Sequence, residues 1–332
     1  MTDLIHIWAG LVALVMILYI IMDGTSLGVG ILFFSTRDEK EQDILIDSIS
    51  PVWDANQTWL VFGGAAIFAV FPPVYTVLSS ALYIPLITFL LGLIFRGVTF
   101  EFRANALRKK GWDLAFSLGS LVAVLSQGFT LGGILTGVKV SGTNFAGGPF
   151  DWLNPFSVMV GCALVPGYIM LGSTYLIIKT AGPVQERAYR YASRSTLIVL
   201  FFMAVVTIWT PFHYPIVWKF WFSLPRLYFI WAFPLMGLIA AFQLLRSLRN
   251  RRREISPHLY SFGLFLSGYF GLLASLYPYA IPPSITFQDA ASQYETLRFM
   301  LWGTVIVLPV VLVYVIYSYS VFRGKVSAGE YY

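Results

Sequence analysis

The sequence predicts an all-α, polytopic membrane protein of about nine transmembrane helices, arranged as two four-helix bundles plus one peripheral helix. Its 332 residues are 58% hydrophobic and only 11% charged, with a mean hydropathy of +0.74, whereas about a quarter of a soluble domain is charged. Apolar runs of about 20 residues recur, and each is long enough to cross a bilayer as a helix. The alternating ten-residue strands of a membrane β-barrel are absent. We therefore interpret residues 1–332 as a single integral membrane domain.

Nine segments are predicted to span the membrane, with no loop long enough for a soluble domain. The first apolar run has no Lys or Arg before it and no small-residue cleavage site after it, so we expect it to be retained rather than removed as a signal peptide. Tryptophans near the predicted span ends are typical of interfacial belts. The expected spans are 5–33, 52–71, 75–99, 113–136, 156–179, 196–212, 227–247, 258–279 and 297–322.

The basic residues predict the orientation of these spans. Eighteen of the 22 Lys and Arg follow odd-numbered spans, and only Lys139, Lys219, Arg226 and Arg298 fall on the other side. Because cytoplasmic loops are enriched in Lys and Arg, we expect the N-terminus outside and the C-terminus in the cytoplasm. The eighteen are Arg37, Lys40, Arg96, Arg103, Arg108, Lys109, Lys110, Lys179, Arg187, Arg190, Arg194, Arg246, Arg249, Arg251, Arg252, Arg253, Arg323 and Lys325.

Two carboxylates near the cytoplasmic ends of the first two spans are candidate functional residues, because charge inside a bilayer is costly. Asp54 opens the second span between Trp53 and Trp59, with Asn56 and Gln57 nearby to hold water. It fits a proton-uptake group, since burial and neighbouring charges tune carboxylates. It fits equally well an acid that stabilises the first turn of a helix.

The other polar residues in the spans give weaker signals. Asp23 in IIMDGTSLGVGIL fits either a second proton carrier or a satisfied turn or helix break beside Gly24. Arg96, Glu101 and Arg103 suggest a charged rim of solvated ion pairs, Asp113 suggests a helix cap, and Gln127 fits a contact with a neighbouring helix. The glycines of GTSLGVG suggest close helix packing rather than a nucleotide loop, which would follow a strand.

Several functions are excluded or made less favourable by composition. One cysteine, Cys162, excludes an internal disulfide and an iron–sulfur cluster held by this chain alone. The three histidines lie near span ends or in loops, so the chain is not expected to supply a full set of haem ligands. The basic residues form no single patch for nucleic acid. The LLRSLRNRRRE cluster fits an ordinary inner-face anchor better than a specific site for anionic lipid.

Seven segments, in order, resemble subunit II of the cytochrome bd family of quinol oxidases, most closely its cyanide-insensitive branch. MDGTSLGVGIL is similar to the family's DGFDLGVGIL, and SPVWDANQTWLVFGGAA to its PVWDGNETWL segment. The remaining five are ALYIPLITFLLGLIFRGVTFEFR, DWLNPFSVMVG, LGSTYLIIKT, IPPSITFQDAAS and YSYSVFRGKV.

The resemblance implies a respiratory complex in the bacterial inner membrane. This chain would pair with a homologous subunit I that carries haems b and d and the quinol site. Quinol would be oxidised on the outer side and oxygen reduced to water with protons from the cytoplasm. The chain itself would bind no haem, while a structural quinone and a small single-helix third subunit occur in some members.

The resemblance also bears on individual residues. It implies that Trp53 and Asp54 lie on a cytoplasmic proton route, and it makes Arg96 and Asp113 signature positions without an assigned role. The family's second acid in DGFDLG is Ser26 here. If that acid relays protons in other members, Asp23 or water must serve here, with Ser26 on the path, or the route differs.

Two alternatives stay open from the sequence: a secondary transporter, and a quinol-anchor subunit of another membrane oxidoreductase. Neither paired broken helices nor an inverted repeat is recognisable, which disfavours the transporter.

Overall fold

A computed structural model describes residues 1–213, 218, 221–224 and 226–326 of the chain. Within these residues eight helices are long and apolar enough to cross a membrane, or nine if the bent pair α3–α4 counts as one span. The expected all-α membrane fold is therefore confirmed. Lys219, one of the basic residues assigned to the outer side, lies outside the described residues.

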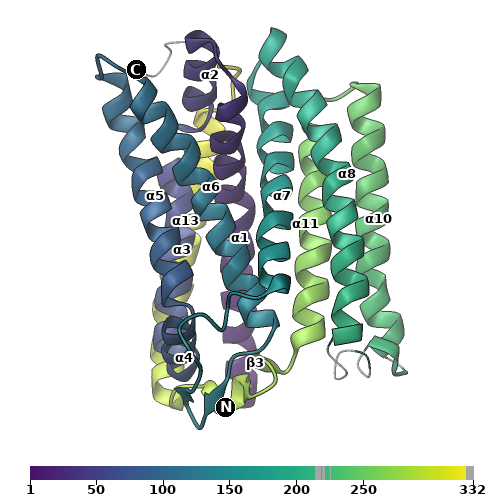
Figure 1. The fold of residues 1–332 in the computed structure, drawn as a ribbon. Coiled ribbons are helices and arrows are strands. Elements are labelled where there is room, and N and C mark those ends of the chain that lie inside the picture. The colour runs from purple at the N-terminus through teal and green to yellow at the C-terminus, as the bar shows by residue number, and fades with distance from the viewer. Residues whose placement is uncertain (214–217, 219–220, 225, 327–332) are drawn as a thin grey trace.

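The long helices alternate in direction along one axis (Figure 1). The N-terminus lies at one end of the molecule, and the carboxyl end of α13 lies at the other end together with α2, which we call the α2 end. The helices are α1 Thr2–Leu32, α2 Glu39–Ile49, α3 Trp53–Val70, α4 Pro72–Ala81, α5 Tyr83–Ala104, α6 Lys110–Leu135, α7 Pro155–Lys179, α8 Gly182–His213, α10 Arg226–Asn250, α11 Ile255–Leu276, α12 Phe287–Ala290 and α13 Tyr294–Val321, with a 3-10 turn η1 at Phe33–Ser35.

Two small hairpins lie at the end opposite α2. Each is a two-stranded antiparallel sheet, and they lie in the α6–α7 and α11–α13 connections. The strands are β1 Val140–Ser141, β2 Asn144–Phe145, β3 Tyr279–Ile281 and β4 Ile285–Thr286.

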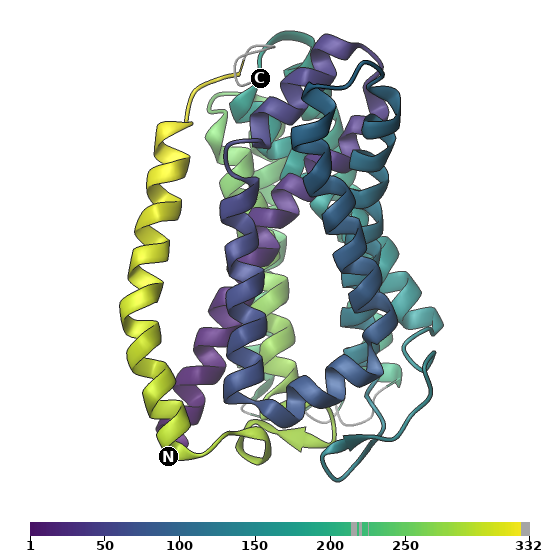
Figure 2. The same ribbon diagram turned by 90° about the vertical axis from the view of Figure 1, so that its left-hand side faces the viewer.

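The spans form two groups of four helices and one peripheral helix. In the first group α1 packs on α3 and α6, and α5 packs along α6; in the second, α7 pairs with α8 and α11, and α10 with α11 and α8. Contacts of α7 with α1 and α6 join the groups. Helix α13 packs on α3 at the edge of the first group (Figure 2). This is the expected arrangement of two bundles plus one helix.

Glycines allow the helices of the two groups to cross closely. A Cβ on Gly28 of α1 would lie 1.8 Å from the carbonyl oxygen of Tyr168 in α7, and one on Gly172 would lie 2.5 Å from the carbonyl carbon of Gly28. Only hydrogen fits in that space, as the glycines of GTSLGVG suggested.

Helix α2 was not expected, because residues 38–50 were treated as a loop. Asp38 caps its first turn through Glu41 N–H, and the apolar residues Leu45, Ile46 and Ile49 are buried beneath it. Its polar face binds both groups of helices. Arg103 of α5, in the first group, lies 2.6 Å from Asp43. In the second group, Arg187 of α8 lies 2.5 Å from Glu41, and the Tyr175 hydroxyl of α7 donates to the Ser48 carbonyl. Thus α2 is a short amphipathic bracket across the α2 end.

The expected span 75–99 began too early. The chain bends by 118° between α3 and α4, and α5 begins only at Tyr83. Pro72 and Pro73 open α4, where a missing N–H is tolerated, while the same prolines would interrupt a continuous helix. Figure 2 shows the resulting corner at the end opposite α2.

The span expected at 196–212 is instead the last part of a longer helix. Helix α8 begins at Gly182, fourteen residues earlier, because its first turns carry Glu186, Arg187, Arg190 and Arg194 and continue beyond the apolar segment. A search of the sequence for apolar segments detects only the part of a helix that would lie in the hydrocarbon core of the membrane.

Candidate functional site

A fully buried ion pair joins α1 and α5. Arg96 Nη2 donates to Asp23 Oδ1 at 2.8 Å, with side-chain exposures of 1% and 0%. One expectation for each of these residues was wrong, while the proton-carrier alternative for Asp23 stays a prediction. Arg96 is not part of a solvated rim, and Asp23 does not mark a helix break, because α1 is continuous from Thr2 to Leu32.

Further donors lead to the second oxygen of Asp23. The Tyr19 hydroxyl, one turn earlier on α1, donates to Asp23 Oδ2 at 3.0 Å. Gln127 of α6 donates to that hydroxyl at 2.9 Å, and the Tyr168 hydroxyl of α7 donates to Gln127 Oε1 at 2.6 Å. The predicted contact of Gln127 with a neighbouring helix therefore exists, and the network spans α1, α5, α6 and α7.

Sequence reasoning missed Tyr19 and Tyr168. Tyrosine is common in membrane helices, and neither residue stands in a polar segment. The one usable signal was spacing, since Tyr19 precedes Asp23 by four residues and so shares its helix face.

A second buried branch lies one turn further along α1. The Asn56 amide donates to Ser26 Oγ at 3.0 Å and to the Met22 carbonyl at 3.1 Å. The Tyr319 hydroxyl of α13 donates to Asn56 Oδ1 at 3.0 Å. Asn56 and Ser26, both candidates from the sequence, thus meet and tie α1, α3 and α13 together.

Asp54 does not join this network. It lies in the first turn of α3, is exposed, and forms no hydrogen bond or ion pair with the described residues. Two residues along a helix correspond to about 200°, so Asp54 and Asn56 point to opposite sides of α3. Asp54 and Asp23 are therefore not brought together, and Asp54 faces away from this chain.

The residues next to Asp54 in the chain, unlike Asp54 itself, contact other parts of the protein or are partly buried. Trp53 is stacked on Phe100 of α5, with ring centroids 4.8 Å apart and planes at 10°. Gln57 is half-buried, and its Nε2 has no hydrogen-bond partner among the described residues. Val52, which precedes α3, makes no side-chain cap, and Asp54 accepts no backbone N–H.

A charged cluster closes the α2 end. Arg103 Nη1 lies 2.6 Å from Asp43 of α2, and its Nε lies 2.6 Å from Asp113 of α6. Lys109 bonds Glu39 of α2 at 2.8 Å. The Arg103 side chain is only 5% exposed, so the expected solvated rim is wrong here too. Asp113 is bound in an ion pair in addition to standing in the first turn of α6, whereas Glu101 is exposed and unpaired among the described residues.

Aromatic rings separate this cluster from the buried ion pair. Arg103 follows Arg96 by seven residues on α5, about 10 Å along the axis. Phe100 lies between them and packs edge-on against Phe116, which in turn packs edge-on against Phe33. The three rings are at most 2% exposed, so the Asp23–Arg96 pair is insulated from the charged end of the molecule.

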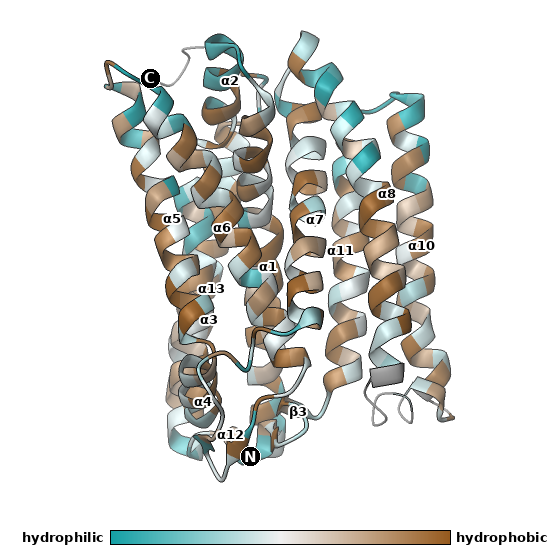
Figure 3. Ribbon diagram, in the orientation of Figure 1, coloured by the Kyte–Doolittle hydropathy of each residue, from teal (hydrophilic) through white to brown (hydrophobic). Residues whose placement is uncertain are grey.

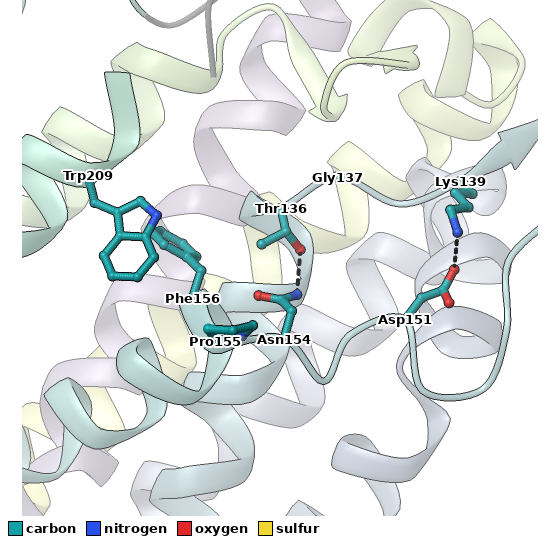
Figure 4. Close-up of a pocket in the computed structure, with 8 residues that line it drawn as sticks. All are labelled: Thr136, Gly137, Lys139, Asp151, Asn154, Pro155, Phe156 and Trp209. Atoms are coloured by element: carbon teal, nitrogen blue, oxygen red, sulfur yellow. Dashed lines mark hydrogen bonds and ion pairs between the residues drawn. The ribbon is translucent and has the colours of Figure 1, made fainter. Parts of the chain in front are cut away.

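A cavity of about 410 Å³ lies at the other end, between the α6–α7 connection and α8 (Figure 4). Phe156 and Trp209 supply aromatic rings, and Thr136 and Asn154 supply polar groups. The Lys139 ammonium lies 3.0 Å from Asp151 at the rim and lowers the pKa of that exposed carboxyl through a hydrogen bond. This cavity combines apolar walls with a few polar groups, as small-molecule sites do.

The model of the family described as "Cytochrome bd terminal oxidase subunit II" matches residues 4–322. The chain is 29% identical to cytochrome bd-I ubiquinol oxidase subunit 2 of Escherichia coli K12, over 97% of this chain and 94% of that protein. It is also 29% identical to cytochrome bd ubiquinol oxidase subunit 2 of Bacillus subtilis 168, over 99% of both chains.

A solved structure shares the fold. A chain of the bd oxidase from Geobacillus thermodenitrificans superposes with a TM-score of 0.71 at 19% identity, covering 97% of this chain and 99% of that one.

Proposed function

Since the chain belongs to the cytochrome bd terminal oxidase subunit II family, we propose that it supports a haem-bearing subunit I and supplies it with protons from the cytoplasm. The chain is a multi-pass subunit of a cytochrome bd quinol oxidase, an oxidoreductase of the bacterial inner membrane, and such an oxidase contains a partner subunit I. Family membership decides against the transporter and against an anchor for another oxidoreductase.

We further propose that haems b and d reside in subunit I and that this chain binds none. A structural quinone would fit the 410 Å³ cavity, where its ring could stack against Phe156 and Trp209, and Asn154 and Thr136 could bond its oxygens. A small single-helix third subunit belongs to the same proposal, and the exposed apolar surface of α13 offers room for one. Purification of the intact oxidase tests all three, through the haem content of each separated subunit, extraction of quinone, and the subunits present.

One observation carries the proton proposal: Asp54 points out of this chain. A carboxylate on the outer face of a membrane helix needs water or a partner protein beside it. The α3 surface that continues from Asp54 is formed by Val61, Gly64, Ala65 and Phe68, spaced for packing against another helix. Asp54 at the α2 end of that surface can therefore take a proton from inner-side water and pass it across the subunit boundary.

The buried branch takes a different part in this proposal. Asp23 has both oxygens engaged, by Arg96 and by Tyr19, and Ser26 accepts from Asn56. We assign Asp23, with Ser26 beside it, to a fixed counter-charge that orders the helices behind Trp53 and Asp54. This differs from the relay role that the sequence suggested for Asp23.

The test is Asp54→Asn in the complete oxidase. Loss of a positioned proton-transfer group should slow quinol-driven oxygen consumption by about tenfold or more, while haem content stays near that of the parent. The matched control is Glu295→Gln, which removes an exposed acid from the first turn of α13.

Two outcomes would contradict the relay. Unchanged turnover over a wide pH range would show that Asp54 carries no proton. Loss of assembled oxidase, with the Glu295→Gln control also impaired, would assign Asp54 to helix stabilisation instead.

A further inference from the structure

Four exposed arginines lie on α8 and α10 at the α2 end. They are Arg190 and Arg194 on α8, and Arg246 and Arg249 on α10. None of the four forms an ion pair or hydrogen bond within the described part of the chain. Each pair is separated by three or four residues, so its side chains project from the same helix face.

Each pair terminates an apolar stripe on its own helix. On α10 the exposed residues Leu235, Ile239 and Phe242 lead at helical spacing to Arg246 and Arg249. The last apolar residue precedes the first arginine by about 6 Å along the axis. In Figure 3 the ribbon of α10 is hydrophilic in colour at its upper end and more hydrophobic below it, in agreement with this order.

Helix α8 repeats this order in the opposite chain direction. Ile208, Phe201 and Leu197 are each more than half exposed, and Arg194 and Arg190 follow on the same face. The two helices are neighbours. Two adjacent helices therefore present apolar surface that ends at one level in guanidinium groups.

The nearby acids do not neutralise these arginines, because they are paired elsewhere. Glu186 bonds Arg251 at 2.6 Å, and the Arg251 guanidinium lies 4.5 Å from the centroid of the Tyr189 ring. Glu254 bonds Lys325 at 2.8 Å, and this hydrogen bond lowers the pKa of the Glu254 carboxyl. Arg252 and Arg253 add two further exposed positive charges to the α10–α11 loop.

We propose that these arginines bind the phosphate groups of anionic phospholipids, whose acyl chains lie along the apolar stripes below. Guanidinium forks match phosphate oxygens in two-point hydrogen bonds. A soluble anion would use the arginines alone, whereas an anionic lipid uses both the charge and the adjoining apolar face. The site lies on the second group of helices, and its occupancy does not depend on the proposed proton route.

The test compares lipid retention by the purified oxidase complex. The Arg246→Gln/Arg249→Gln and Arg190→Gln/Arg194→Gln variants are incubated with phosphatidylglycerol or phosphatidylcholine, and bound lipid is counted by native mass spectrometry. Each arginine near an anionic headgroup contributes about fivefold in affinity, so each double variant should bind phosphatidylglycerol about 25-fold more weakly. Phosphatidylcholine retention should not change.

The matched control is Arg37→Gln/Lys40→Gln, which removes two exposed basic residues from the same end but without an apolar stripe. An equal loss of phosphatidylglycerol in this control would overturn the proposal, because general surface charge would then explain binding.

A second experiment with inorganic phosphate distinguishes a lipid site from a site for soluble anions. If it raises the thermal unfolding midpoint of the parent as much as phosphatidylglycerol does, the arginines are a simple anion site and the lipid assignment is wrong. Unchanged oxygen consumption in detergent verifies that the variants are assembled.

Discussion

The carboxylate of Asp23 receives a charged donor on one oxygen and a hydroxyl on the other. Burying two charges costs several kcal/mol for each ion, and only good geometry with additional hydrogen bonds offsets this cost. Tyr19, Gln127 and Tyr168 supply those bonds in sequence, each donor directed toward the carboxylate. The network therefore depends on its charges being present together.

Removing one charge of the Asp23–Arg96 pair should consequently destabilise the folded protein more than removing both charges. Arg96→Leu leaves Asp23 buried without its counter-charge, and we expect a loss of about 3–5 kcal/mol. The Arg96→Leu/Asp23→Leu double variant should recover part of that loss. The thermal unfolding midpoint of the purified oxidase measures both effects, and a double variant no more stable than the single one would count against the ion pair as described.

At the level of residues, the sequence identified the polar groups but not their pairing. Asp23, Arg96, Asn56 and Gln127 were singled out because polar groups are rare in apolar spans. Their partners were not predictable, because Asp23 and Arg96 are 73 residues apart and meet only through helix packing. Proximity in the chain instead suggested grouping Arg96 with Glu101, and that grouping was wrong.

At the level of elements, the crossing of α1 and α7 at Gly28 leaves no room for a side chain. The Tyr168 carbonyl occupies the place where a Cβ of Gly28 would be, and Tyr168 also donates to Gln127 of α6. The crossing thus sets the position of Tyr168 as well as the spacing of the two helices.

A side chain at this crossing should separate the helices. Gly28→Val would meet a backbone carbonyl that cannot move aside, so we expect a destabilisation of about 3 kcal/mol or more. Gly10→Val lies on the same helix with no atom within 4 Å of the added Cβ, and it should stay close to the parent. Accumulation and thermal stability of the two variant oxidases provide the measurement. Equal behaviour of the two variants would refute the close crossing.

Short elements were predicted less well than long ones, for a physical reason. Helix α2 buries one face and exposes the other, so its average hydropathy is too low for a membrane span and its charges suggest a loop. The corner between α3 and α4 lies inside apolar sequence, where only Pro72 and Pro73 mark it. The thickness of the bilayer core sets the length of a membrane-spanning helix and so makes it recognisable in the sequence. A short surface helix such as α2 or a bend such as that between α3 and α4 depends instead on tertiary contacts.

At the level of the whole molecule, the basic loops gather at one end. The connections after α1, α5, α7 and α10, and the carboxyl end of α13, all lie at the α2 end (Figures 1 and 2). The alternation predicted from the charges is therefore present in the fold. Which side of the membrane this end occupies stays a prediction from the positive-inside rule.

Reporter fusions test that orientation. A fluorescent protein that matures only in the cytoplasm, attached after Val326, should fluoresce. An alkaline phosphatase inserted after Leu153, in the α6–α7 connection, should be active because that loop would lie outside. The reverse pattern, with a silent C-terminal fusion and an inactive inserted phosphatase, would invert the predicted topology.

The bracket formed by α2 has a consequence for biosynthesis. Its partners Arg103, Tyr175 and Arg187 are made after it, and Arg187 follows Glu41 by nearly 150 positions. At about 5–20 residues per second, a ribosome needs roughly 7–30 s to cover that distance. During this interval the apolar face of α2 has only the earlier helices to pack against, and its uncovered part rests at the bilayer surface. The ion pair between Glu41 of α2 and Arg187 of α8 can therefore form only after α8 is made, and it then joins the helices inserted first to those inserted later.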